Sequence, residues 1–134
     1  EVSKGFKWLV VIGFLLVSAQ ILLGTQVREQ IDEIAMQTSQ RSTWISMLDA
    51  KVLIHRSFSI LILLSGIWLF WRNWKNDYAL WSVGAFSVLI VLEIVVGIVL
   101  FYFDMPKIAQ PIHLWISTGM FSFVFWAMIR SKVD

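Results

Sequence analysis

Two short stretches of the sequence resemble each other, and together they contain both of the protein's histidines. One covers residues 54–59 (IHRSFS) and the other covers residues 112–117 (IHLWIS). Each follows an earlier apolar run that ends in a polar-Ile-x-x-Gly pattern, at residues 20–24 (QILLG) and 93–97 (EIVVG). Because both motifs recur in the same order, the sequence predicts a duplicated helix pair that supplies one histidine from each copy to a shared ligand.

The paired histidines suit a haem iron, which can take one axial imidazole on each face when a helical bundle supplies them. Glycine lets a helix backbone approach a flat ring closely, which gives Gly24 and Gly97 a place beside His55 and His113. Copper or zinc is an alternative ligand, but a usual zinc site takes three or four protein ligands and no third is obvious. A packing role for these histidines and glycines is the remaining alternative. The sequence has no cysteine, which excludes disulfides, thiol catalysis and thiolate-bound metals.

Four charged residues are candidates to serve the same ligand. Glu93 is the one acid inside an apolar run, where ionisable residues are costly and are functional candidates by default. It could accept a bond from a ligand histidine, carry protons, or stay protonated against a nearby serine. Arg28, Arg56 and Lys107 lie at or near the outer ends of the runs, where they could bind haem propionates. Arg56 is favoured because it directly follows His55, whereas Arg28 and Lys107 could simply extend toward the membrane surface.

The composition is that of a membrane protein. Hydrophobic residues make up 58% of the 134 residues and charged residues only 15%, whereas a soluble domain is nearer a quarter charged. We therefore expect one domain over residues 1–134, surrounded by membrane lipid. The cationic residues are scattered, so nothing indicates a nucleic-acid partner.

Four apolar runs predict four transmembrane helices, at residues 8–27, 52–71, 78–102 and 112–129. Short connections between them predict an all-α fold, an antiparallel four-helix transmembrane bundle made of two repeated helix pairs. Residues 28–49 are predicted to form a polar loop. Part of it can be helical, with Ile31, Ile34 and Ala35 on one face, either on the membrane or in water.

The distribution of Lys and Arg predicts the orientation. The termini and the 72–77 turn carry six such residues: Lys4, Lys7, Arg72, Lys75, Arg130 and Lys132. The other two loops carry four, or five with Arg56: Arg28, Arg41, Lys51 and Lys107. We expect both termini in the cytoplasm, in a bacterial inner membrane. At 1.5 Å of rise per residue, His55 and His113 then lie roughly 5 Å below the outer surface, level with Gly24 and Gly97.

Residues 20–29 (QILLGTQVRE), followed later by residues 55–58 (HRSF), resemble the haem A synthase family. Its members are eight-helix membrane enzymes built from two similar four-helix halves. They oxidise the C8 methyl of haem O to the formyl group of haem A for cytochrome oxidase. The chain resembles the C-terminal half over nearly its whole length, and the resemblance implies that His55 and His113 ligate a haem b. The substrate haem is expected to react in the N-terminal half.

Two departures from the family shape the functional expectation. Four spans are present and the sequence begins at Glu1, so we expect a fragment or processed product whose N-terminal catalytic half is another chain or is replaced by a further copy. The outer-loop cysteine pair of some members is absent, and no catalytic residue is carried over. We expect part of an oxidoreductase with haem O as a possible substrate and little activity alone. Alternatives are a b-type cytochrome for membrane electron transfer and a non-haem assembly subunit.

Overall fold

The computed structural model describes residues 2–133, so that residues 1 and 134 of the predicted domain and the side chain of Lys132 lie outside the described part. Its elements are α1 (Lys4–Gln37), η1 (Arg41–Thr43), α2 (Trp44–Met47), α3 (Ala50–Lys75), α4 (Trp81–Tyr102) and α5 (Ala109–Val133). Four of them, α1, α3, α4 and α5, are long and apolar enough to cross a membrane. The predicted all-α four-helix membrane fold is confirmed.

The helix ends follow from local chemistry. Ser3 accepts a hydrogen bond from the Phe6 amide at the start of α1, and Asp49 accepts one from the Lys51 amide at the start of α3. Both are the short polar residues that satisfy free amide groups at helix N-termini. Pro111 lies in the first turn of α5, where its missing amide proton costs no helical hydrogen bond.

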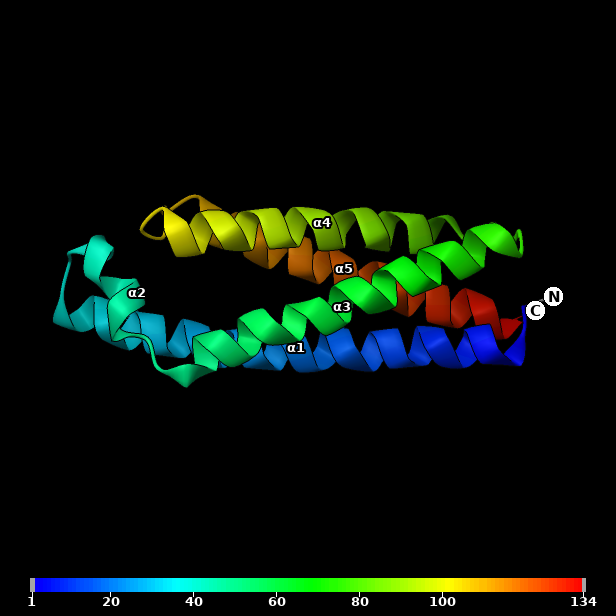
Figure 1. The fold of residues 1–134 in the computed structure, drawn as a ribbon, viewed down its shortest axis with the longest axis horizontal. Helices are drawn as coiled ribbons and strands as arrows, with labels where there is room; N and C mark the ends of the chain where they lie inside the picture. The colour runs from blue at the N-terminus through cyan, green and yellow to red at the C-terminus, as the bar shows by residue number, and fades with distance from the viewer. Residues whose placement is uncertain (1, 134) are drawn as a thin grey trace.

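The four long helices form a closed ring in which each contacts two neighbours. The contacting pairs are α1 with α3, α3 with α4, α4 with α5, and α5 with α1. Both termini and the α3–α4 turn lie at one end, while α2 and the α4–α5 connection lie at the other (Figure 1). The two repeated pairs are therefore α1 with α3 and α4 with α5, and α3 lies diagonally opposite α5.

Two separate apolar clusters hold the bundle together. The larger occupies the half nearer the termini, with Phe6, Leu69, Phe86 and Val124 almost fully buried. The smaller lies at the opposite end and contains Val27, Ile31, Ile34, Trp44 and Met105. Helices in a membrane associate through close van der Waals packing of their side chains, so each cluster stabilises its own end of the bundle.

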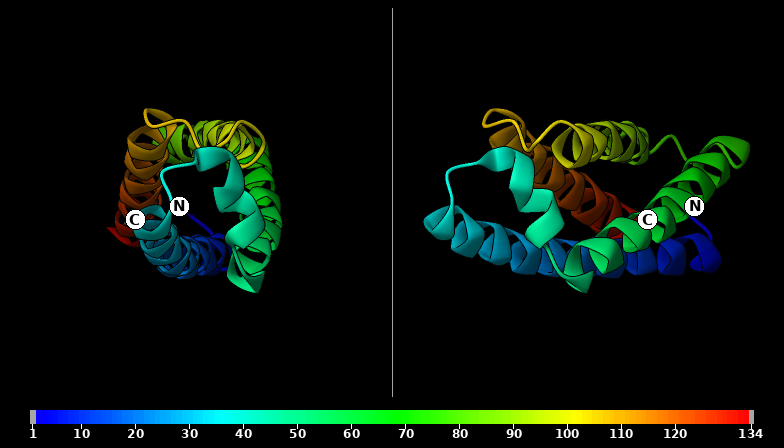
Figure 2. Two further views of the ribbon diagram at one scale, coloured as in Figure 1. Left: turned by 90° about the vertical axis from the view of Figure 1, so that its left-hand side faces the viewer. Right: turned by 60° about the vertical axis from the view of Figure 1, so that its left-hand side comes forward.

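The smaller cluster corrects the prediction of a polar loop at residues 28–49. α1 continues ten residues past Val27, because Ile31 and Ile34 bury one face of the extension against Trp44; Ala35 stays exposed. Residues 38–49, which we call the cap, then fold back so that α2 lies across the end of the bundle (Figure 2, left). The Trp44 indole N–H donates to the Thr38 carbonyl at 3.1 Å.

A cation fastens the cap to the second helix pair. Arg41 donates a hydrogen bond to the Met105 carbonyl in the α4–α5 connection, and its guanidinium lies 4.5 Å from the centre of the Trp44 ring. Asp104 and Met105 both have left-handed backbone angles, with φ of 56° and 52°, and this conformation is uncommon for residues other than glycine. Through Arg41, the long α1–α3 connection is attached to the short α4–α5 connection, so the cap joins the two repeats at this end.

Trp44→Ala is expected to loosen the cap while leaving the four long helices formed. Removing a buried Trp side chain costs about 3 kcal/mol or more, and the small cluster has few other large members. Amide hydrogen exchange or protease cleavage at residues 38–49 in the detergent-purified protein would measure the change. Trp74→Ala is the matched control, because Trp74 is 74% exposed. Equal protection of the cap in both variants would contradict its anchoring by Trp44.

Candidate functional site

The two histidines face each other across the interior of the bundle. His55 comes from the second turn of α3, and His113 comes from the second turn of α5. Their ring centres are 6.4 Å apart and their planes are inclined by 77°. The fold thus brings together the two residues that the sequence motif singled out, although 58 positions separate them in the chain.

The two motif glycines lie against these imidazoles. A Cβ atom built on Gly24 of α1 would come 3.2 Å from Cε1 of His55, and one built on Gly97 of α4 would come 3.7 Å from Cε1 of His113. The first distance is tighter than an ordinary van der Waals contact, and the second is ordinary. A side chain at Gly24 would therefore require His55 to shift by a few tenths of an ångström, whereas one at Gly97 would fit beside His113 without a shift.

The polar residues that begin the two glycine motifs each reach a histidine. Glu93 Oε2 lies 3.3 Å from Nδ1 of His113, with both side chains mostly buried. In the first copy, the Gln20 amide donates instead to the His55 backbone carbonyl at 3.0 Å. The repeat therefore keeps the position of this polar residue but changes its contact, from the backbone of one histidine to the ring of the other.

The histidines lie in a layer from which fully buried apolar side chains are missing. On the side of the termini, the nearest buried apolar residue on each helix lies seven positions from the motif residue. It is Ile62 for His55, Met120 for His113, Val17 for Gly24 and Ile90 for Gly97. Toward the cap, the next on α1 is Val27. The interval from Val17 to Val27 corresponds to about 15 Å of helix. We call this interval the histidine layer.

Both borders of the histidine layer are apolar. Four partly buried residues pack on the larger cluster one turn from the motif positions and form its floor: Ile21, Phe58, Ile94 and Ile116. The cap and its cluster close the other side. All four floor residues belong to the repeated motifs, so the duplication that provides the histidines also provides the apolar surface beneath them.

Unpaired polar atoms gather in the histidine layer. Six buried side-chain atoms of the described residues have no hydrogen-bond partner, and five of them are in this layer: Gln20 Oε1, His55 Nδ1, Glu93 Oε2, Gln110 Nε2 and His113 Nδ1. A buried polar group without a partner costs about 1–3 kcal/mol. Two of the five, Glu93 Oε2 and His113 Nδ1, lie 3.3 Å apart without forming a hydrogen bond. The concentration of such groups makes this layer the candidate binding site of the protein.

Gln110 is the member of this group that sequence reasoning missed. It lies one helical turn before His113 on α5, and its Oε1 accepts a hydrogen bond of 2.7 Å from Arg28 of α1. Arg28 also pairs with Asp32 at 3.0 Å. The available signal was the spacing of three residues between Gln110 and His113, which places both on one helix face.

The other predicted cations lie outside the layer. The Arg56 guanidinium lies 5.0 Å from the centre of the Phe101 ring, and Lys107 is exposed in the α4–α5 connection. Among the described residues, Arg28 is thus the one of the three predicted cations that has a hydrogen bond to a residue of the histidine layer.

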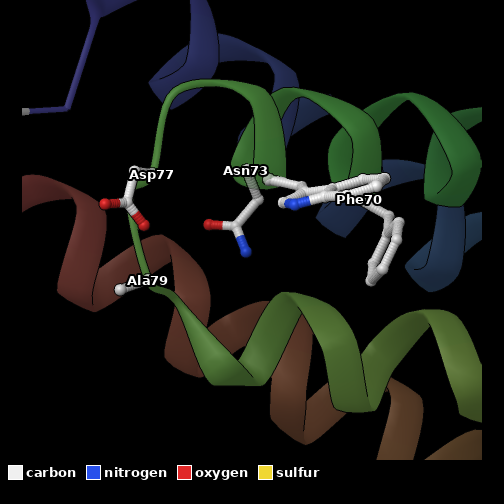
Figure 3. Close-up of a pocket in the computed structure, with 5 residues that line it drawn as sticks. Phe70, Asn73, Asp77 and Ala79 are labelled. Atoms are coloured by element: carbon white, nitrogen blue, oxygen red, sulfur yellow. The ribbon is translucent and has the colours of Figure 1, made fainter.

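Two pockets lie elsewhere on the protein. One is at the α3–α4 turn, where Phe70, Asn73, Trp74, Asp77 and Ala79 line it (Figure 3). The other follows the outer face of α3 from Ala50 to Leu61. Neither includes a histidine, so neither competes with the histidine layer as the place where imidazole chemistry occurs.

The geometry can be compared with that of a metal held by two imidazoles. A ring nitrogen binds a first-row metal at about 2 Å, and the ring centre lies roughly 1 Å behind it, so two opposed rings hold their centres roughly 6 Å apart. The observed 6.4 Å matches this spacing. The described residues contain no group of three or more His, Asp or Glu that could hold a metal ion. A bis-histidine haem therefore fits the residues present better than a protein-bound zinc ion.

Comparison with known proteins agrees with the resemblance seen in residues 20–29 and 55–58. A family model described as cytochrome oxidase assembly protein (COX15-CtaA) matches residues 1–125. No curated protein and no solved structure matches the chain. The match covers nearly the whole sequence, with three of the long helices complete and α5 as far as residue 125. The chain belongs to the haem A synthase family of cytochrome oxidase assembly proteins.

Proposed function

We propose that this chain is the haem-binding four-helix half of a haem A synthase-type enzyme, with one haem b held between His55 and His113. The observation that carries the proposal is the pair of imidazoles, with ring centres 6.4 Å apart, in a layer of otherwise unpaired polar atoms. The family's role in cytochrome oxidase assembly supports haem as the ligand.

The residues around the imidazoles would orient them. Nδ1 of both rings is buried, which favours Nε2 as the ligand atom in each. Glu93 would accept a hydrogen bond from His113 Nδ1, fixing its tautomer and ring orientation as carboxylate partners of metal-bound histidines do. Gln20 would hold the α3 backbone at His55 through its 3.0 Å bond. Gly24 and Gly97 keep the space beside each ring free of a side chain.

When bound, haem supplies one-electron redox chemistry whose potential depends on its axial ligands. Two protein imidazoles would occupy both faces of the iron. This half is therefore suited to passing electrons, and oxidation of haem O would occur in an N-terminal half or in an oligomer of such chains. The apolar floor formed by Ile21, Phe58, Ile94 and Ile116 would shield the ligand from water.

The proposal also includes the orientation of the chain in the membrane and the residues that would bind the haem propionates. The excess of Lys and Arg at the end with the termini and the α3–α4 turn supports cytoplasmic termini, which would place the histidine layer toward the outer leaflet of an inner membrane. Arg28, Arg56 and Lys107 lie toward that outer end and are proposed partners for haem propionates. Of these, Arg28 has the additional support of its bond to Gln110.

A b-type cytochrome unrelated to haem O oxidation is the second candidate. The observation in its favour is that His55 and His113 would provide both axial ligands without help from another chain. It predicts the same spectrum but no connection to haem O. A non-haem assembly subunit predicts no haem spectrum, so haem binding separates it from the other two. Those two differ in whether the chain supports conversion of haem O when a catalytic half is present, because the chain alone is expected to convert little in either case.

His55→Ala and His113→Ala are each expected to abolish the sharp b-type band in the reduced-minus-oxidised absorbance spectrum of the purified protein. Each removes one of two axial ligands, and the remaining imidazole cannot hold the iron on both faces. The control is Gln26→Ala, which changes an exposed residue of α1. Absence of a haem band in the unchanged protein, even after reconstitution with added haem, would contradict the ligand assignment.

Gly24→Ala and Gly97→Ala form a matched pair with different expected outcomes. A methyl group at Gly24 would meet His55 at 3.2 Å and displace the ring, whereas at Gly97 it would meet His113 at an ordinary 3.7 Å. Gly24→Ala should therefore lower the haem content per protein more than Gly97→Ala, as measured by the pyridine haemochrome assay. Similar haem content in the two variants would argue against the role of Gly24 in positioning His55.

The chain alone is expected to bind haem b but to convert little or no haem O to haem A. The physical reason is that two axial imidazoles leave no open position on the iron for an oxidant. Chromatography of haems extracted from membranes that contain the chain and a supply of haem O would measure conversion. Efficient conversion by the chain alone would show that this half, or its oligomer, carries the catalytic site.

A further inference from the structure

The repeat is broken one turn above the histidines, on the side of the cap. Gln110 lies three positions before His113, and the equivalent position before His55 is Val52. Arg28 lies four positions after Gly24, and the equivalent position after Gly97 is Phe101. One copy of the motif therefore contributes a polar residue where the other contributes an apolar one, at both positions.

These four residues form two contrasting edges of the histidine layer. On the side where α1 meets α5, Arg28 donates to Gln110 at 2.7 Å. On the side where α3 meets α4, Val52 packs against the cap cluster and Phe101 lies beneath the guanidinium of Arg56. The duplication supplies equivalent imidazoles, but one edge carries the Arg28–Gln110 hydrogen bond, whereas the other carries the side chains of Val52 and Phe101, with the Arg56 guanidinium over the Phe101 ring.

The bond to Arg28 determines which way the Gln110 amide points. A guanidinium has only hydrogen-bond donors, so the atom of Gln110 that faces it must be the carbonyl oxygen. The amide nitrogen then points away from Arg28, and Nε2 is buried without a partner. Because Gln110 is one turn from His113, this donor is on the helix face that carries the imidazole.

We propose that Gln110 is a positioning residue that donates a hydrogen bond to a carboxylate on one edge of the planar ligand held between His55 and His113. Arg28, which is itself paired with Asp32, fixes the Gln110 amide, while Val52 and Phe101 offer apolar contacts on the other side. A macrocycle with acid groups on one side only would thereby be bound with that side toward Gln110. The proposal rests on the bis-histidine ligand site proposed above and adds the rotational orientation of its ligand.

The test compares two iron porphyrins on the detergent-purified protein after its own haem has been removed. One is iron protoporphyrin IX, with two carboxylates, and the other is iron etioporphyrin, which has only alkyl groups. Absorbance titration of the bis-imidazole band gives Kd for each. Gln110→Leu should weaken protoporphyrin binding about tenfold or more, the usual effect of losing a hydrogen bond to a charged group, and should leave etioporphyrin binding unchanged.

Two further variants make the result specific. Gln110→Glu keeps an acceptor for Arg28 but removes the donor and adds a negative charge, so it should weaken protoporphyrin binding at least as much as Gln110→Leu and spare etioporphyrin. Gln26→Leu, at an exposed position of α1, should change neither Kd. Thermal unfolding of each apoprotein shows whether the fold is intact.

The outcomes separate this inference from the proposed function. An equal loss of affinity for both porphyrins in the Gln110 variants, or no loss for either, would overturn the role of Gln110 and leave the bis-histidine site standing. Failure of the unchanged protein to form a bis-imidazole band with either porphyrin would overturn the ligand site itself, and the orientation with it. A selective loss for protoporphyrin would establish the polar edge.

Discussion

The structure depends on the need to satisfy polar groups inside an apolar bundle. The hydrocarbon region of a membrane offers no water to unpaired groups, and each one left unsatisfied is costly. Here five side-chain atoms without partners lie in one layer, between two apolar clusters. In the proposed arrangement, Glu93 would accept a hydrogen bond from His113 Nδ1, and the Gln110 amide would donate to a carboxylate of the ligand, while the Nε2 atoms of the two imidazoles bind the metal. The rest of the architecture surrounds that layer: a floor of repeated apolar residues, glycines beside the imidazoles and a cap.

Internal duplication explains why a small chain can build such a site. A flat ligand needs equivalent groups on its two faces, and two copies of one helix pair provide them with little extra sequence. The copies have since diverged where equivalence is not needed. Gln20 contacts a backbone and Glu93 contacts a ring, which gives the two imidazoles different surroundings. Arg28 and Gln110 form a hydrogen bond, whereas the equivalent positions of the repeat are Phe101 and Val52. In the proposed site, shared positions would serve the two faces of a ligand, and divergent positions would distinguish its edges.

The cap adds a third kind of asymmetry. The connection from α1 to α3 is long enough to fold back over the bundle, while the connection from α4 to α5 contributes only Met105 and a carbonyl that accepts from Arg41. The cap cluster and the larger cluster place apolar residues at both borders of the layer. Apolar borders limit the access of water, which strengthens electrostatic interactions within the layer, and the potential of the proposed redox group would depend on these surroundings.

The sequence by itself determined the four spans, the antiparallel bundle and the pairing of His55 with His113. These follow from hydropathy, from helix rise and from a repeat whose spacing is visible along the chain. Other features depended on tertiary structure. Trp44 became buried only because the extension of α1 offered Ile31 and Ile34. Arg56 follows His55 directly, yet consecutive helix residues point roughly 100° apart, so it lies on Phe101 instead of in the layer. Gln110 gained its orientation from Arg28, 82 positions away. Sequence periodicity describes one helix at a time, whereas these contacts exist only once separate helices have packed together.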